Sequence, residues 1–254
     1  MVEHPLIPDC DGVQLDSKVQ LLMDRVLQEA KGRDRLIVAL AGPPGSGKTT
    51  LATQLVNRLN GEYAGTVATL FPMDGYHLDN DTLQHRGLLH RKGAPQTFNA
   101  QAFRETLVRI RTGGADISVP IFDRDIDAVV PDADVIGSEI RIVVVEGNYL
   151  LLDQQPWSSL PPLFDLTVFL RVSQKELRAR LIQRWLDQGY DLHGARERAL
   201  SNDIPNARLV AQNSIPADMV VCSATSRGNT GKDSSSPIDP GDVSVDPATG
   251  HGDL

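Results

Sequence analysis

The sequence predicts an α/β protein in which a mainly parallel sheet is covered by helices on both faces. Near-continuous apolar runs alternate with helical patterns along the chain, as expected of strands that are buried on both faces. The 254 residues are 41% hydrophobic, which is enough to bury one sizeable core. We therefore expect a single folded domain.

The first predicted element is a helix from Ser17, in which Val19, Leu22 and Val26 recur at helical spacing. The apolar run of residues 35–42 follows it as a strand that ends in glycine. Five later apolar runs, with helical patterns between most of them, are also expected to be strands: residues 66–71, 118–122, 141–147, 166–172 and 218–222.

The domain boundaries follow from changes in composition. Residues 223–254 are rich in Ser, Gly, Pro and Asp and have few large apolar side chains, so burial cannot offset their ordering entropy. We expect a flexible N-terminus at residues 1–16, a folded domain at residues 17–222 and a disordered tail at residues 223–254.

Charge and cysteine content restrict the function. A formal net charge of -8 argues against a broad electrostatic interface with nucleic acid or an anionic membrane. The start of the chain has no signal-peptide pattern and no run approaches a membrane span, so a cytoplasmic protein is expected. Cys10 and Cys222 lie far apart without CxxC spacing, so neither a disulfide nor a zinc site is expected. The sequence leaves open whether the chain forms a homo-oligomer.

The strongest motif is GPPGSGKT, Gly42 to Thr49, which fits G-x-x-x-x-G-K-[ST] between a predicted strand and a predicted helix. In such a loop, backbone N–H groups and the helix N-terminus form a concavity for polyphosphate. Lys48 is expected to reach the β- and γ-phosphates of ATP, and the Thr49 hydroxyl to bind Mg²⁺. The expected nucleotide-binding residues are Gly42, Pro43, Pro44, Gly45, Ser46, Gly47, Lys48, Thr49 and Thr50.

Two carboxylates follow predicted strands and should therefore lie at the same edge of the sheet. Asp74 comes after the strand at residues 66–71, where a carboxylate can accept the proton of an attacking hydroxyl. A simple turn cap followed by Gly75 is the alternative. Glu146 ends the strand at residues 141–147 and is expected to hold Mg²⁺ directly or through water, with a solvated strand end as its alternative.

Two arginines lie four residues apart on one predicted helix. Like charges at this spacing repel each other on a bare helix, so Arg180 and Arg184 favour a lid over the transferring phosphate. A solvated basic face answered by Glu176 and Asp187 is equally compatible with the pattern.

Together these motifs resemble the phosphoribulokinase, uridine kinase and pantothenate kinase superfamily of P-loop kinases. The resemblance spans roughly residues 17–222 and rests on GPPGSGKTT, MDGYH, VVVEGNYLL and the arginine-bearing helix after VFLRV. RKGAPQTFN and VPIFDRDIDAVVP resemble a poorly characterised branch with fungal ATP-dependent kinases and bacterial sugar-kinase-like members. The resemblance implies a P-loop NTPase-type three-layer fold and phosphoryl transfer from ATP to a small-molecule hydroxyl, with Asp74 as base.

The resemblance does not identify the acceptor. Gly75 and Tyr76 follow the aspartate as in pantothenate kinases, but Phe122 and Arg124 stand where those enzymes usually carry tyrosine and histidine. By analogy, the acceptor pocket is lined by Tyr76, His77, Arg91, Lys92, Phe122, Asp123 and Arg124. Nucleosides, sugars and pantothenate-like molecules all remain candidate acceptors.

A second class of function also remains open. The chain could be a nucleotide-dependent binding or regulatory protein that retains the P-loop and phosphorylates no acceptor. Asp74 and the basic HRKG segment favour the kinase, because a binding module has no need for a base at the sheet edge.

Overall fold

The computed structural model describes residues 15–63 and 65–222 as an α/β domain. Its main sheet has five strands in the order β2-β5-β1-β6-β7, and every neighbouring pair is parallel. The strands are β1 (Leu36–Ala41), β2 (Ala68–Pro72), β5 (Ile142–Gly147), β6 (Leu166–Arg171) and β7 (Met219–Cys222). The expected mainly parallel sheet is confirmed.

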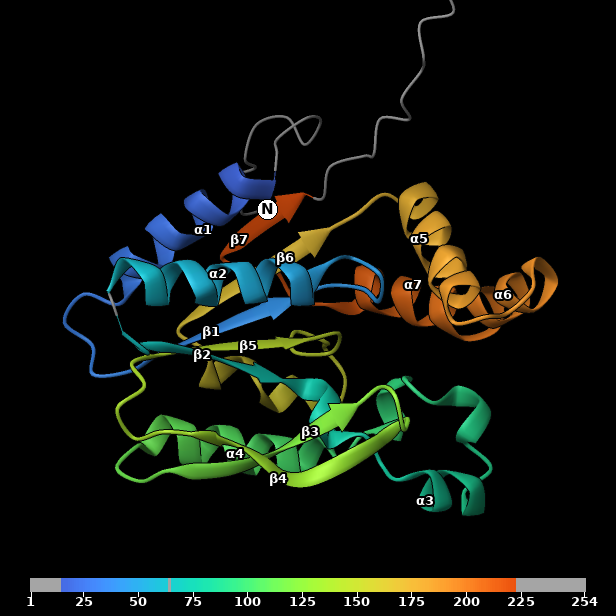
Figure 1. The fold of residues 1–254 in the computed structure, drawn as a ribbon, viewed down its shortest axis with the longest axis horizontal. Coiled ribbons are helices and arrows are strands. Elements are labelled where there is room, and N and C mark those ends of the chain that lie inside the picture. Colours follow the sequence, from blue (N-terminus) through green and yellow to red (C-terminus); the bar gives the residue numbers. More distant parts are fainter. Residues whose placement is uncertain (1–14, 64, 223–254) are drawn as a thin grey trace, which may run out of the picture.

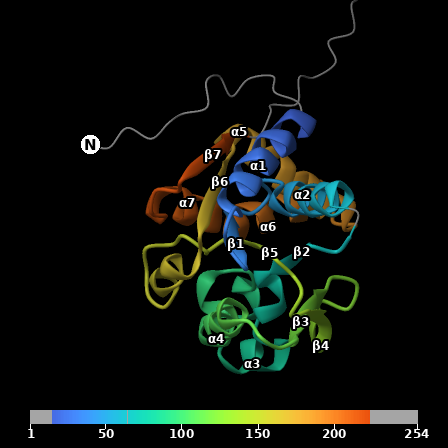
Figure 2. The same cartoon turned by 90° about the vertical axis from the view of Figure 1, so that its left-hand side faces the viewer.

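Helices cover both faces of this sheet, as Figures 1 and 2 show. On one face, α1 (Leu15–Glu29) and α2 (Lys48–Glu62) pack over β1, and their apolar side chains share one core cluster with those of the strands. On the other face, α4 (Ala100–Thr112) and α7 (Ile204–Asn213) contribute to a second cluster. Residues of β1 alternate between the two clusters, because successive strand side chains point to opposite faces.

Several further elements lie at the carboxyl ends of the strands (Figure 1). They include the 3₁₀ turn η1 (Met73–Tyr76), α3 (Asn80–His85), α5 (Gln174–Asp187) and α6 (Leu192–Arg198). A π-helical turn, Ala199–Asp203, joins α6 to α7. This edge carries the strand-end residues that the sequence singled out.

The strand predicted at residues 118–122 forms, but it does not join the main sheet. As β3 (Ile117–Asp123) it pairs antiparallel with β4 (Ala128–Ile136) in a separate hairpin. The strand β4 was not expected, because its exposed stretch Pro131–Val135 lacks the apolar run of a buried strand. The hairpin lies beside η1, where it bears on the site.

At the ends of the domain, some expectations need revision and others concern residues outside the described part of the chain. The first helix begins at Leu15, two residues before the expected start, and the Asp16 carboxylate accepts a 2.6 Å hydrogen bond from Arg58. Cys222 is disulfide-bonded, so the expectation of a free thiol there is wrong, since sequence spacing does not report which cysteines meet in space. Residues 15 and 16 of the N-terminus expected to be flexible (1–16) therefore belong to α1, whereas Cys10, residues 1–14 and the tail expected to be disordered (223–254) lie outside the described part of the chain.

Across the residues that the structure describes, we find no helix with the length and apolar character needed to cross a membrane.

Candidate active site

The P-loop forms as expected at the carboxyl end of β1. Gly45 and Gly47 have φ angles of 77° and 90°, which only glycine adopts readily, and Gly47 is the N-cap of α2. A Cβ on Gly45 would lie 3.0 Å from the Leu181 side chain of α5, so α5 packs closely on the loop. The open N-terminus of α2 therefore faces the concavity in which phosphate is expected.

Lys48 and Glu146 form a buried pair of opposite charges beside this loop. Lys48 is 7% exposed, and its Nζ donates to the carbonyl oxygen of Pro43 at 3.1 Å and to Oδ1 of Asn148 at 2.7 Å. Glu146 is 5% exposed and accepts a 3.1 Å hydrogen bond from the Thr49 hydroxyl. Burial lowers the pKa of Lys48 and raises the pKa of Glu146, and the charge of each opposes the shift of the other.

The sheet register explains why these groups meet. Glu146 of β5 lies between Leu40 of β1 and Pro72 of β2. The P-loop continues directly from β1, and Asp74 follows β2 by two residues. Lys48, Glu146 and Asp74 therefore lie at the carboxyl ends of three adjacent strands. The negative charges of Glu146 and Asp74 both act to raise the pKa of Lys48, against the effect of burial.

Asp74 lies in η1, against the hairpin of β3 and β4. Its side chain is 29% exposed, and Oδ2 accepts from Nη2 of Arg124 at 3.3 Å. Gly75 follows it because a Cβ at this position would clash with the backbone carbonyl of Pro120 in β3. The glycine permits close contact between η1 and the hairpin, and this contact brings Arg124 to Asp74.

Arg180 and Arg184, the two arginines expected to form a lid, are both on α5. Arg180 Nη1 donates to the carbonyl oxygens of Ser46 at 3.3 Å and Gly45 at 3.5 Å, and its Nε pairs with Glu176 at 3.0 Å. The positive charge of Arg184 contributes to the lowered pKa of Lys48, after burial as the main cause. Glu176 therefore forms an ion pair with Arg180, as expected if this helix face were a solvated basic face. Arg180 also contacts the P-loop, however.

The predicted acceptor residues are only partly brought together. The His77 ring lies between Phe98 and Phe122, with ring centroids 4.0 and 4.7 Å away, and Lys92 Nζ lies 4.9 Å from the Phe122 centroid. His77 Nδ1 is 2.8 Å from the carbonyl oxygen of Asp74, and burial lowers the pKa of this histidine. His77 and Arg124 therefore contact Asp74, Phe122 packs against His77, and Lys92 lies over the Phe122 ring.

The other three acceptor candidates have local structural contacts. Tyr76 is 6% exposed and its ring packs against Phe71 and Phe103 in the core, since η1 turns this side chain inward. Asp123 Oδ1 accepts from the backbone N–H of Asp125 in the hairpin turn. Arg91 donates to the carbonyl oxygen of Ser201 at 3.2 Å. None of these contacts favours a place in the acceptor pocket.

Two side chains at the site were not singled out from the sequence. Asn148 accepts a hydrogen bond from Lys48 and comes two residues after Glu146. Its position directly after a buried strand could have marked it as a site residue in the sequence. Asp203 is 7% exposed and accepts a 2.6 Å hydrogen bond from Trp185 Nε1. No local pattern marks Asp203, because Trp185 is 18 positions away in the chain.

The hydroxyl of Thr49 and the carboxylate of Glu146 are suitable as the protein ligands of a magnesium ion. Magnesium at nucleotide sites keeps several waters and takes phosphate oxygens, so it needs only one or two protein ligands. The hydroxyl and carboxylate oxygens lie 3.1 Å apart beside the P-loop. Within residues 15–63 and 65–222, no three His, Cys, Asp or Glu side chains group to hold a metal without such additional ligands.

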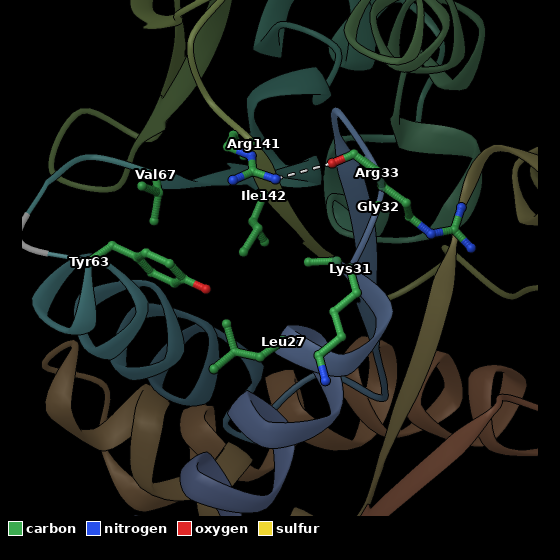
Figure 3. A pocket seen from close by; sticks show the side chains of 9 residues that line it. Leu27, Lys31, Gly32, Arg33, Tyr63, Val67, Arg141 and Ile142 are labelled. Carbon is green, nitrogen blue, oxygen red and sulfur yellow. Dashed lines mark hydrogen bonds between the residues drawn. The ribbon is translucent and has the colours of Figure 1, made fainter.

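A separate cavity of about 220 Å³ lies at the opposite edge of the sheet (Figure 3). Its lining includes Leu27 of α1, Tyr63 after α2 and Ile142 at the start of β5. Figure 3 shows Arg141 donating to the backbone carbonyl of Arg33 beside it, a hydrogen bond of 3.3 Å. The amino ends of the strands form this edge, so the cavity is not part of the phosphate-facing site.

Comparisons with known proteins agree with this arrangement. The profile of the Phosphoribulokinase / Uridine kinase family matches residues 37–226. A Schizosaccharomyces pombe protein named as a candidate uridine kinase is 34% identical over 211 residues, which cover 79% of this chain and 88% of that protein. A Nocardioides sp. pantothenate kinase is 29% identical over 165 residues, covering 63% of this chain and 50% of the enzyme.

Solved structures include a close match in fold. The crystal structure of a candidate fructose transport system kinase from Silicibacter sp. has 39% sequence identity and a TM-score of 0.74. The match covers 82% of this chain and 99% of that one. The family profile spans most of the chain. The chain therefore belongs to the phosphoribulokinase/uridine kinase family of P-loop small-molecule kinases.

Proposed function

We propose that this protein transfers the γ-phosphate of ATP to a hydroxyl group of a small metabolite, with Mg²⁺ as cofactor. The observation that carries the proposal is the convergence of Lys48, Glu146 and Asp74 at one edge of three adjacent strands. Phosphoryl transfer depends mainly on positioning and on charge stabilisation, and this edge offers both.

The P-loop binds and orients the phosphates. Backbone N–H groups of Gly45 to Thr49 donate hydrogen bonds to the phosphate oxygens. The N-terminus of α2 adds its partial positive charge. Lys48 is held by Asn148 and Pro43 until phosphate oxygens replace these acceptors. Thr49 and Glu146 would hold Mg²⁺, which neutralises charge that develops on the phosphate oxygens.

Asp74 acts as the base. The acceptor hydroxyl gives its proton to the Asp74 carboxylate as its oxygen bonds the γ-phosphorus, and the bond to the ADP oxygen breaks. Arg124, 3.3 Å from Asp74 Oδ2, holds the carboxylate in place. Arg180 and Arg184 bring positive charge to the transferring group from α5.

The acceptor binds against His77, Phe122, Lys92 and Arg124. The neighbouring rings of His77 and Phe122 suit a flat or ring-shaped acceptor, and the cations Lys92 and Arg124 suit hydroxyl or anionic groups. Relatives named for uridine, pantothenate and fructose transport support a panel of these three acceptor classes.

The deciding experiment measures ADP formation and phosphorylated product with that panel of nucleosides, sugars and pantothenate-like acids. ADP formation that requires one acceptor, with matching product, is the expected result. ATP hydrolysis that no acceptor stimulates, or nucleotide binding without turnover, would instead favour a binding or regulatory protein.

Lys48→Ala is the matched variant for this assay. It removes the ammonium group and leaves the backbone of the loop, so nucleotide should still bind weakly while transfer falls by at least about 10²-fold. Lys31→Ala, at the remote cavity, is the control and should keep wild-type turnover. Normal turnover by Lys48→Ala would remove the P-loop from the mechanism.

A further inference from the structure

The π turn Ala199–Asp203 lies between the nucleotide side and the acceptor side of the proposed site. It joins α6 to α7 within one helical path from Leu192 to Asn213. A single π turn inserted in a helix is rare and often accompanies a functional site. Here the turn makes hydrogen bonds in two directions.

On the nucleotide side, the turn contacts α5 through Asp203. The buried carboxylate accepts from Trp185 Nε1 at 2.6 Å. Two guanidinium groups lie over the Trp185 ring, with Arg184 Cζ 5.4 Å and Arg198 Cζ 5.2 Å from its centre. The same helix carries Arg180, which bonds the P-loop carbonyls. Asp203 thus positions the helix that contacts the phosphate loop.

On the acceptor side, the turn holds the loop of residues 89–92, which we term the acceptor loop. Asn202 Nδ2 donates to the carbonyl oxygen of Lys92 at 2.8 Å, and Arg91 Nη1 donates to that of Ser201 at 3.2 Å. Lys92 Nζ then bonds Asp127, in the turn between β3 and β4, at 2.9 Å to Oδ2 and 2.7 Å to the carbonyl oxygen. That hairpin also supplies Arg124 to Asp74.

We propose that the π turn couples the nucleotide site to the acceptor loop, with Asp203 positioning Trp185 of α5 and Asn202 holding the backbone of Lys92. The proposal rests on the proposed function, because it treats the two sides as donor and acceptor sites. When ATP binds and orders α5 over the P-loop, it then also orders residues 89–92. Because coupling between two sites is reciprocal, a bound acceptor in turn strengthens ATP binding.

Amide hydrogen exchange of residues 89–92 provides the test without knowledge of the acceptor. The N–H groups of Arg91 and Lys92 bond the carbonyls of Leu88 and Leu89 at 2.8 and 3.1 Å, so their exchange reports opening of this turn. The probe is the magnesium complex of the β,γ-imido analogue of ATP, added to the full chain.

Two variants break the coupling from opposite sides. Asn202→Ala removes the donor to Lys92, and Trp185→Phe removes the donor to Asp203 while keeping an aromatic ring. Ser201→Ala is the control, because Ser201 contacts Arg91 through its backbone carbonyl. Thermal melting of each variant checks that it is folded, and either variant alone is sufficient for the decision.

In the wild-type protein and in Ser201→Ala, nucleotide should slow exchange of these amides by about fivefold or more. Asn202→Ala should lose most of this protection while its nucleotide Kd changes less than about threefold, because the hydrogen bonds of its side chain go to Lys92 and Asn206, which lie outside α5 and the P-loop. Binding without protection in the wild type, or protection that persists in either folded variant, would overturn the coupling alone. Failure of the wild type to bind nucleotide would overturn the proposed function as well.

Discussion

Lys48 and Glu146 illustrate how single residues depend on one another at this site. Each is nearly fully buried, and burial by itself disfavours the charged form of both. Their mutual attraction opposes this effect. Removal of either charge therefore leaves the other buried with less compensation, so the two are expected to be sensitive to substitution as a pair.

Asp74→Asn tests the base at the residue scale. Asparagine keeps the size and cannot accept the proton, so kcat should fall by about 10²- to 10⁴-fold while ATP affinity and fold stay near normal. Steady-state kinetics and ATP titration measure both quantities.

Asp79→Asn provides the matched control for this substitution. Asp79 caps α3 by accepting from Thr82 N–H, and asparagine caps a helix about as well as aspartate. Its activity should survive. If Asp74→Asn were equally active, Asp74 would be a turn cap and the base would have to be another group.

Asp203→Asn tests the buried acid through the pH dependence of stability. Burial raises the pKa of Asp203, although Arg184, the Trp185 N–H and Arg198 partly oppose this. Between the ordinary aspartate pKa and the raised one, the folded protein keeps a proton that the unfolded chain has lost. Wild-type stability therefore falls as pH rises through this window, by about 1.4 kcal/mol per unit of pKa difference.

Asparagine stays neutral and does not incur this loss. The thermal midpoint of Asp203→Asn relative to wild type should therefore rise from pH 4 towards pH 7, in the direction set by the raised pKa. Melting curves of both proteins in the same buffers provide the comparison. A difference that is independent of pH would mean that Asp203 titrates alike in the folded and unfolded states.

Much of the residue-scale site could be predicted, because its residues belong to local patterns. Lys48 and Thr49 lie in a motif, and Asp74 and Glu146 follow apolar runs that end at one sheet edge. Asp203 could not be predicted in this way, since its burial depends on a tryptophan from another helix. The inward rotation of Tyr76 is likewise set by the tertiary position of η1.

At the scale of elements, the close contact between η1 and β3 is expected to be highly sensitive to substitution. Gly75→Ala would place a Cβ against the backbone of Pro120, so the hairpin must shift away from Asp74. We expect a stability loss of about 1–3 kcal/mol. Acceptor-dependent kcat/KM should also fall while ATP affinity is retained, because the P-loop is not touched.

Gly61→Ala in α2 is the control for Gly75→Ala. A Cβ there meets nothing within 4 Å, and alanine stabilises a helix by about 0.5–1 kcal/mol relative to glycine. Denaturant unfolding and steady-state kinetics distinguish the two variants. Normal activity of Gly75→Ala would show that the position of the hairpin is not needed for catalysis.

The hairpin of β3 and β4 is the part of the fold that apolar runs did not predict correctly. Apolar runs predicted β1, β2, β5, β6 and β7 in the main sheet, because strands buried on both faces need apolar side chains throughout. The same rule assigned β3 to that sheet and missed β4. A two-stranded hairpin with an exposed face needs no such run, and only its contact with η1 shows where it lies.

At the scale of the whole molecule, deletion of residues 223–254 should leave the domain intact. Their composition provides too little apolar surface to dock, and the deletion keeps Cys222 with its disulfide. The thermal midpoint and acceptor-dependent ATP turnover should match those of the full chain. A large loss in either would mean that the tail contributes to the folded structure.

The strand order has a consequence for how the protein assembles during synthesis. β1 emerges early, but both of its hydrogen-bonded neighbours, β5 and β6, come late in the chain. The ribosome therefore completes η1, the acceptor loop and the hairpin before the P-loop has a sheet to support it. Because ATP stabilises only a conformation that it can bind, we expect it to assist the last stage of folding and no earlier one.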